Sequence, residues 1–156
     1  MLYVNTVSMS QDNGQAVIAG DKAKPLANYP HARVVGGFIF VSGISSRNFD
    51  NTYEGVKELP DGSFQLDIKE QTKAVIQNIK SILELSGATL NNLVDLTVFL
   101  KDMNDYNDFN EVYNQFFDAK TGPSRTTVAV KDLPSPKLLI EIKAVAVMPA
   151  YSTQLY

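Results

Sequence analysis

The sequence predicts an α+β layer fold in which two helices pack on one face of a mixed β-sheet. The pattern of apolar residues is the first reason. Two segments carry apolar residues at helical spacing. Five further segments are runs of β-branched or aromatic residues, or alternate apolar and polar residues, as strands do. The elements follow one another in the order β-β-α-β-α-β-β. The length is the second reason, because 156 residues suit one domain and bury roughly 70 % of the surface that the unfolded chain exposes.

The chain begins with a weakly patterned segment. Residues 1–20 are interpreted as an N-terminal extension, within which residues 17–19 could form a short strand. The single domain is expected over residues 21–150, and residues 151–156 are interpreted as a C-terminal tail.

A β-hairpin is the first regular element expected. Residues 33–35 and 38–41 are β-branched or aromatic, and Gly36-Gly37 between them suits the positive φ angles of a tight turn. Residues 45–62 then show no sustained period, so a long loop or an irregular hairpin is expected there. A loop of this length in a compact domain is often functional.

The clearest helical pattern covers residues 67–86. Asp67 can cap the first turn, Glu70 completes a capping-box pattern, and Gly87 is the expected stop. Its buried face carries Val75, Ile76, Ile79, Ile82 and Leu83. A second helix is expected over about residues 104–119, and its aromatic stripe is assigned to the core rather than to a stacking platform.

Strands account for the remaining regular structure. Residues 91–102 alternate at period two, residues 125–130 are rich in Thr and Val, and residues 138–148 form a long apolar run. Two helices cover one face of the resulting sheet and leave the other without a cover. Self-association through that uncovered apolar face is therefore expected.

The composition excludes several kinds of chemistry. The chain has no cysteine and one histidine, His31, which excludes thiol nucleophiles, disulfides and a His-rich metal site within one chain. The net charge of −3, with scattered Lys and Arg, argues against a nucleic-acid surface. The sequence shows no secretory signal and no apolar run of the ~20 residues that a membrane helix needs, so a cytoplasmic protein is expected.

Two charged residues stand out beside or within strands. Arg125 follows a Pro-set turn, where its guanidinium could bind a carboxylate through two N–H groups; an ordinary surface arginine is the alternative. Glu141 interrupts an apolar strand, where burial would raise the pKa of its carboxyl and favour proton transfer. A simple ion pair with Lys143 or with a neighbouring strand is the alternative for Glu141. Position alone favours the simpler interpretation of both residues.

The loop after the first hairpin is densely polar. Arg47, with the hydroxyls and amides around it, could bind an anion, or the loop could be a solvated turn. Tyr29, in a Pro-rich approach to the hairpin, could pack or could orient a substrate. His31 is interpreted as a loop residue, since no Ser and Asp arrangement around it suggests a catalytic triad.

Several of these segments together carry a family resemblance. They are Gly37–Gly43, Val98–Tyr106, Gly122–Val128, Leu133-Pro134 and Ile140–Ile142. In these motifs the chain resembles the Rid family (reactive intermediate deaminases, also called YjgF or L-PSP endoribonuclease-like) from about Lys24 to Pro149. Within the family, the segments 24–31, 42–52 and 116–119 are similar to the 2-aminomuconate deaminase branch.

The resemblance implies a chorismate-mutase-like fold and a homotrimer, with the sheets turned inward and the helices outside. It also implies active sites in the clefts between subunits and no metal or organic cofactor. Members of the family hydrolyse imines and enamines to ketones and ammonia. The expected activity is accordingly that of a deaminase that converts a 2-aminomuconate-type enamine dicarboxylate to the 2-oxo acid.

The resemblance also implies roles for particular residues. The arginine that matches Arg125 holds the substrate carboxylate, and the glutamate that matches Glu141 positions or activates water. The positions of Tyr29, Ser42, Gly43 and Asn104 line the family site.

Two further substrate-binding assignments are specific to this chain. Many deaminating members carry cysteine where this chain has Thr127, and backbone groups near Thr127 and Gly43 could stabilise the polar intermediate. Arg47 is the hypothetical anchor for the distal carboxylate of the substrate.

Two other functions remain open at this point. A broad-specificity deaminase that clears reactive imines would keep Arg125 and Glu141 and give Arg47 no special role. A non-catalytic trimer could instead bind small carboxylates or act as a chaperone-like regulator. Ribonuclease activity is disfavoured, because the chain is acidic and lacks a pair of histidines or a basic groove.

Overall fold

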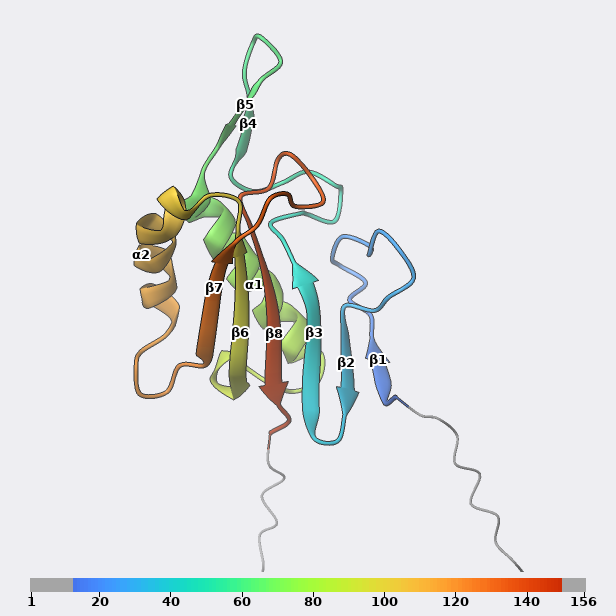
Figure 1. The fold of residues 1–156 in the computed structure, drawn as a ribbon. Coiled ribbons are helices and arrows are strands. Elements are labelled where there is room, and N and C mark those ends of the chain that lie inside the picture. The colour runs from blue at the N-terminus through green and yellow to red at the C-terminus, as the bar shows by residue number, and fades with distance from the viewer. Residues whose placement is uncertain (1–12, 150–156) are drawn as a thin grey trace, which may run out of the picture.

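The computed structural model describes residues 13–149 and has two layers (Figure 1). One layer is a six-stranded sheet in the order β1-β2-β3-β8-β6-β7, and the other contains the helices α1 (Ile68–Glu84) and α2 (Tyr106–Phe116). The strands are β1 Gln15–Val17, β2 Ala32–Val35, β3 Phe38–Ile44, β6 Leu93–Leu100, β7 Ser124–Ala129 and β8 Ile140–Val147. The predicted α+β layer fold is confirmed.

The first hairpin forms where it is predicted. Strands β2 and β3 pair in antiparallel fashion, and Gly36 and Gly37 make the turn at φ angles of 59° and 80°. Strand β1 pairs with β2 two residues earlier than the short strand considered at residues 17–19. The ladder does not continue to Ala19, whose N–H donates to the His31 ring instead. The rest of the extension, residues 1–12, and the tail, residues 151–156, lie outside the described residues, so the domain boundaries stay a prediction.

The segment after β3 contains a second, smaller hairpin. Strands β4 (Val56–Glu58) and β5 (Phe64–Leu66) pair with each other and project beyond the six-stranded sheet (Figure 1). Of the two structures considered for this region, the irregular hairpin is correct. The loop between β3 and β4 is closed separately by an isolated bridge between Arg47 and Tyr53.

The helix boundaries follow the local signals. The Asp67 carboxylate caps α1 by accepting from the N–H groups of Lys69 and Glu70. Gly87 adopts φ 75° just beyond the helix, as a stop residue does. Helix α2 starts after a 3₁₀ turn, Met103–Asp105, and ends before the predicted residue 119 because Phe117 is extended.

The strand order is mixed in direction. Strands β6 and β7 run parallel, and α2 connects them as the crossover that parallel neighbours require. Strand β8, the last in sequence, pairs in antiparallel fashion with both β3 and β6 and so lies at the centre of the sheet. Helix α1 packs across β3 and β8, beside α2 (Figure 1).

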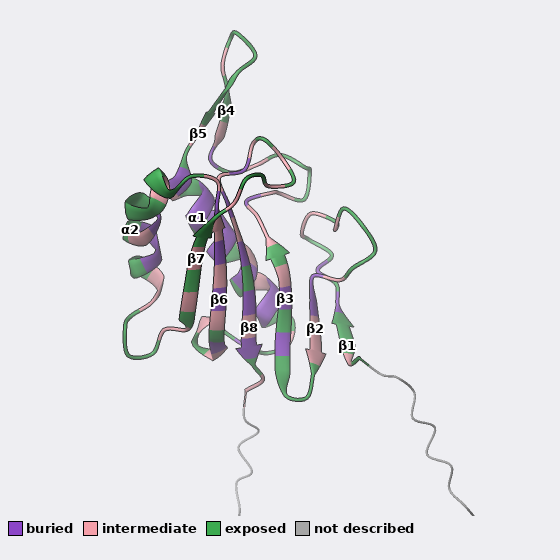
Figure 2. Cartoon of the chain, viewed as in Figure 1, coloured by how far each residue is buried: buried purple, intermediate pink, exposed green. Residues whose placement is uncertain are grey.

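Buried and more exposed residues alternate along β8, so the two faces of the sheet differ in burial (Figure 2). Beneath the helices, the buried residues of β8 are Ile140, Ile142, Ala144 and Ala146. On the other face Phe38, Phe40 and Val147 remain 44 %, 42 % and 41 % exposed in the single chain. An apolar surface therefore lies open where the sequence predicts one.

Within residues 13–149, no helix combines the length and the apolar character that crossing a membrane demands. The same residues contain no cluster of three or more His, Cys, Asp or Glu side chains arranged to hold a metal ion.

Candidate functional site

Strand β6 separates the two residues expected to carry the chemistry. Arg125 pairs with Leu96, whereas Glu141 pairs with Phe99, three residues further along β6. Residues paired across a ladder share a face of the sheet, and residues an odd number apart on one strand lie on opposite faces. Arg125 therefore projects toward the helices and Glu141 toward the open face. One chain does not bring these two side chains together.

The Glu141 carboxylate lies directly on the backbone of β3. The register of β3 and β8 shifts between Val41 and Ile44, which marks a bulge that contains Gly43. A Cβ atom added at Gly43 would lie 2.1 Å from Glu141 Oε1. Only glycine therefore allows the carboxylate this position, a close approach that the sequence pattern alone did not reveal.

Glu141 has no ion pair among the described residues. Burial raises the pKa of its carboxyl above the ordinary value. The simple ion pair with Lys143 considered from the sequence is absent, because Lys143 pairs with Thr97 further along β6 and is exposed. A half-buried carboxyl with a raised pKa is suited to exchange protons with a bound reactant.

Two adjoining cavities open beside this carboxyl and share the lining residues Tyr29, Gly43, Ser45 and Arg47. The first has a volume of about 60 Å³ and is also lined by Ser42 and His31. The second, of about 70 Å³, is completed by Glu141 together with Leu26, Tyr53, Pro134, Ser135 and Leu138. A water molecule needs roughly 10–15 Å³, so either cavity has room for water beside a small ligand group.

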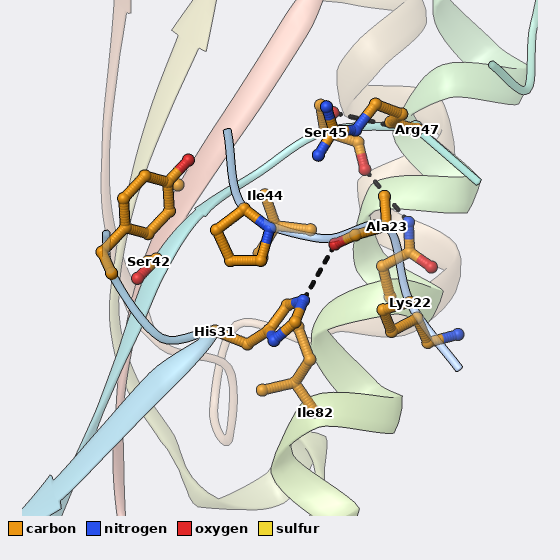
Figure 3. Close-up of a pocket in the computed structure, with 12 residues that line it drawn as sticks. Lys22, Ala23, His31, Ser42, Ile44, Ser45, Arg47 and Ile82 are labelled. Atoms are coloured by element: carbon orange, nitrogen blue, oxygen red, sulfur yellow. Dashed lines mark hydrogen bonds between the residues drawn. The ribbon is translucent and has the colours of Figure 1, made fainter. Parts of the chain in front are cut away.

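Arg47 brings a positive charge to both cavities, and Lys22 also lines the first (Figure 3). Arg47 Nη2 donates to the carbonyl of Lys24, and the Arg47 backbone forms the bridge with Tyr53. Among the described residues no carboxylate pairs with its guanidinium. Of the two interpretations of this loop, the arrangement favours an anion site over a merely solvated turn.

The approach to the hairpin forms another wall. The Ser42 hydroxyl donates to the carbonyl of Pro30 at 2.8 Å, and the Ser42 N–H donates to the carbonyl of His31 at 2.9 Å. Tyr29, which directly precedes Pro30, lines the cavity. Its side chain is 47 % exposed and is not packed into the core. The structure thus places Tyr29, Gly43 and Arg47 on both adjoining cavities, with Ser42 on the first and Glu141 on the second.

His31 is more important to this wall than its sequence context suggests. It is a loop residue, as expected, but it is only 5 % exposed. Its Nδ1 accepts from the N–H of Ala19 at 3.1 Å, and its Nε2 lies 2.9 Å from the carbonyl of Ala23, to which it donates (Figure 3). These two bonds require the neutral ring and hold residues 19–23 against the cavity.

Two polar residues of α1 also support the site and were missed in the sequence. Asn78 Nδ2 donates to the carbonyl of Ser45 at 3.0 Å. The fully buried Gln71 donates to the carbonyl of Lys137 at 2.8 Å and accepts from the N–H of Leu139 at 2.9 Å. A polar side chain on the apolar face of a predicted helix is the signal that could have identified Gln71.

The remaining candidates lie on the other side of β6. Arg125 forms no ion pair among the described residues, and its guanidinium carbon lies 4.5 Å from the centre of the Tyr113 ring. Thr127 is two residues further along β7, and its hydroxyl is buried without a hydrogen-bond partner. Asn104 is exposed in the 3₁₀ turn before α2. The candidates therefore form two separate groups within one chain.

The sequence over residues 19–148 matches the model of the family described as endoribonuclease L-PSP. The chain belongs to this family. The resemblance noted in the sequence is thus confirmed, and one solved relative, YyfA of Yersinia pestis, is described as a member of the Rid protein family.

Relatives of this Rid-family chain cover most of its length. A RutC family protein of Pyrococcus abyssi is 47 % identical over 131 residues, which are 83 % of this chain and 94 % of the relative. The crystal structure of yeast Mmf1 superposes with a TM-score of 0.74 at 31 % identity and covers 86 % of this chain and 98 % of its own. Escherichia coli TdcF, solved with bound serine, gives a TM-score of 0.71 at 27 % identity, covering 86 % and 99 %.

Proposed function

We propose that this protein hydrolyses the imine or enamine form of 2-amino acids to the 2-oxo acid and ammonia. The observation that carries the proposal is the Glu141 carboxyl, which has a raised pKa and faces a cavity that has room for water and is also lined by Arg47. Family membership supports it. The name of Escherichia coli TdcF, 37 % identical over 91 residues, provisionally describes that relative as a reactive intermediate deaminase, and TdcF has been solved with an amino acid bound.

The chain would complete its site by self-association. Arg125 and Glu141 project from opposite faces of one sheet, so a substrate that contacts both must lie between two copies. The exposed apolar face that includes Phe38, Phe40 and Val147 is available to bury in such an assembly. The proposed assembly is a homotrimer in which Arg125 of one copy faces the Glu141 cavity of the next.

The chemistry then follows from the two groups. Arg125 binds the carboxylate beside the imine carbon through two N–H groups and so orients the carbon toward the cavity. A water held by Glu141 forms the new C–O bond as the C=N double bond becomes single; one water proton passes to the carboxylate, and the imine nitrogen takes a proton from solvent water. The carbinolamine then loses ammonia: Glu141 returns its proton to the nitrogen, the C–N bond breaks, and the hydroxyl gives its proton back to solvent water to leave the ketone.

In this scheme backbone groups near Gly43 and Thr127 would stabilise the polar intermediate. The family resemblance implies cysteine at the position of Thr127 in many deaminating members, but the hydrolysis written here needs no thiol. The substrate-binding set is then Tyr29, Ser42, Gly43, Arg47, Asn104 and Thr127. No cofactor takes part in this scheme.

The substrate class is proposed to be an enamine dicarboxylate of the 2-aminomuconate type. Arg47 lines the same cavity as Glu141 and pairs with no carboxylate within residues 13–149, so it can bind a second carboxylate that shorter imines lack. A broad-specificity deaminase is the alternative, in which Arg47 serves only to hold the carbonyl of Lys24. A cytoplasmic location stays a prediction.

A direct assay tests the proposal. The full chain is mixed with freshly generated 2-aminomuconate and, separately, with 2-aminoacrylate, while ultraviolet absorbance and ammonia release are followed. Arg125→Ala and Glu141→Gln should each lose turnover. Lys80→Ala, which alters an exposed ion pair on α1, is the control that should retain it.

Three outcomes separate the functions. Acceleration of the dicarboxylate reaction well above that of 2-aminoacrylate supports the proposed substrate class, and equal acceleration favours the broad deaminase. No acceleration over the spontaneous reaction of either substrate refutes the enzymatic function and leaves a carboxylate-binding or chaperone-like role.

A further inference from the structure

Three aromatic rings of α2 lie beneath the Arg125 guanidinium. Its central carbon is 4.5 Å from the ring centre of Tyr113, 4.9 Å from that of Phe109 and 5.9 Å from that of Tyr106. We call these three residues the aromatic cradle. The sequence assigns all of them to the core, but Tyr106 is 38 % exposed, and the two buried rings face a cation as well as the core.

The rings of the cradle are themselves held in place. Phe109 is fully buried, Tyr113 is 9 % exposed, and their ring centres lie 5.7 Å apart. Tyr113 also packs against Phe117 at 4.7 Å. Burial raises the pKa of the Tyr113 hydroxyl despite the opposing effect of Arg125, so this ring stays neutral at physiological pH.

The cradle and Arg125 belong to one structural unit. Helix α2 is the crossover between β6 and β7, and Arg125 is the second residue of β7. The guanidinium Nη2 also lies 3.4 Å from the Tyr106 hydroxyl, which can accept from it at the exposed rim. A cation above ring faces is attracted by their quadrupoles, and this attraction strengthens where water is excluded.

This support leaves the arginine charge uncompensated. An ion pair would orient a guanidinium but would compete with an incoming carboxylate, whereas aromatic rings orient it without competing. Among the described residues, no acidic side chain pairs with Arg125. Orientation before binding reduces the conformational entropy that the side chain loses when the ligand arrives.

We propose that Tyr113 and Phe109, with Tyr106 at the rim, are positioning residues that orient Arg125 for the carboxylate of its ligand. The inference rests on the proposed function in one respect, which is that the ligand of Arg125 is the substrate. The competing explanation is that the arginine stem merely covers apolar surface of α2. The two explanations differ in whether loss of a ring changes carboxylate binding or only stability.

The test compares Tyr113→Leu with Tyr113→Phe, which keeps the ring and removes the hydroxyl. Tyr113→Leu is expected to raise KM for 2-aminoacrylate about tenfold, the change that about 1.4 kcal/mol of lost binding produces. Its kcat should stay within about twofold of the wild type, because the water-activating group is untouched. Tyr113→Phe should keep KM near that of the wild type. If Tyr113→Leu lowers kcat and leaves KM unchanged, the substitution has only reduced the amount of folded protein. That result overturns the proposal.

A second measurement does not depend on turnover. The Arg125 side-chain resonances, assigned by their absence in Arg125→Lys, should be shifted by the ring currents of the cradle. Tyr113→Leu should move them toward the values of a free arginine and weaken their response to added pyruvate, a simple 2-oxo acid, whereas Tyr113→Phe should do neither. The proposal is overturned if the Arg125 resonances and their response to pyruvate are the same in the wild type, Tyr113→Leu and Tyr113→Phe. If the wild type turns over neither imine, the proposed function fails, and the cradle is judged on this measurement.

Discussion

Gly43→Ala is the most direct test of the contact between β3 and the Glu141 carboxylate. The added Cβ would lie 2.1 Å from Glu141 Oε1, 3.0 Å from its Cδ and 3.4 Å from its Cγ. An ordinary contact begins near the last of these distances, so the carboxylate oxygen must retreat by about 1.3 Å. Because the obstructing atom is the end of a side chain rather than backbone, the fold should accommodate the change.

The expected consequence is kinetic. A displacement of about 1 Å in a catalytic group costs roughly 100-fold in rate, so kcat for imine hydrolysis should fall by about that factor. The melting temperature should change little, because Gly43 is exposed and a methyl group there meets the carboxylate end of Glu141 and no backbone.

The assay is steady-state hydrolysis of 2-aminomuconate with ammonia detection, together with thermal unfolding followed by circular dichroism. Gly20→Ala is the matched control, since nothing lies within 4 Å of the Cβ it would add. A Gly43→Ala protein that is folded and retains kcat within threefold of the control would refute the placement of Glu141 as the water-activating group.

Three further predictions concern the same cavities. Burial raises the pKa of Glu141, so its ionisation costs stability above that pKa; Glu141→Gln should therefore melt above the wild type at pH 7, and this advantage should vanish at pH 4, below the ordinary value of 4.5. An equal advantage at both pH values would contradict the shift. Arg47→Ala should raise KM for the dicarboxylate about tenfold and leave KM for 2-aminoacrylate unchanged, which a comparison of the two substrates measures; an unchanged KM for the dicarboxylate removes Arg47 from the site. His31→Ala leaves unpaired the partners of one buried and one partly buried hydrogen bond and should cost about 2 kcal/mol, or roughly 4–8 °C in melting temperature by calorimetry. A loss under 1 °C would show that residues 19–23 do not depend on the ring.

The elements that were predicted correctly depend on local interactions. The Gly36-Gly37 turn needs only two residues with positive φ, and the Asp67 cap needs only the N–H groups that follow it. Strand β8 shows its buried face in its own alternation. For the β4–β5 hairpin the sequence does not decide between a long loop and an irregular hairpin, because strands of three residues are too short to show a period.

The candidate site depends on non-local pairing. Tyr29, Arg47 and Glu141 are far apart in sequence and meet because β8 pairs with β3 beside the bulge at Gly43. A bulge shifts the register by an amount that composition does not show. The burial of His31 likewise follows from the position of residues 19–23, which nothing near His31 in the sequence indicates.

By itself, the sequence determined the inventory of chemistry in this protein: carboxylates, arginines and hydroxyls without thiols, on an α+β layer fold of the Rid family. Only the tertiary structure decided how these groups are divided. Strand β6 lies between β7 and β8, which separates Arg125 from Glu141 and leaves each on a different face. The physical reason is that strand order results from burial summed over the whole sheet, whereas helical and strand periods arise within each segment.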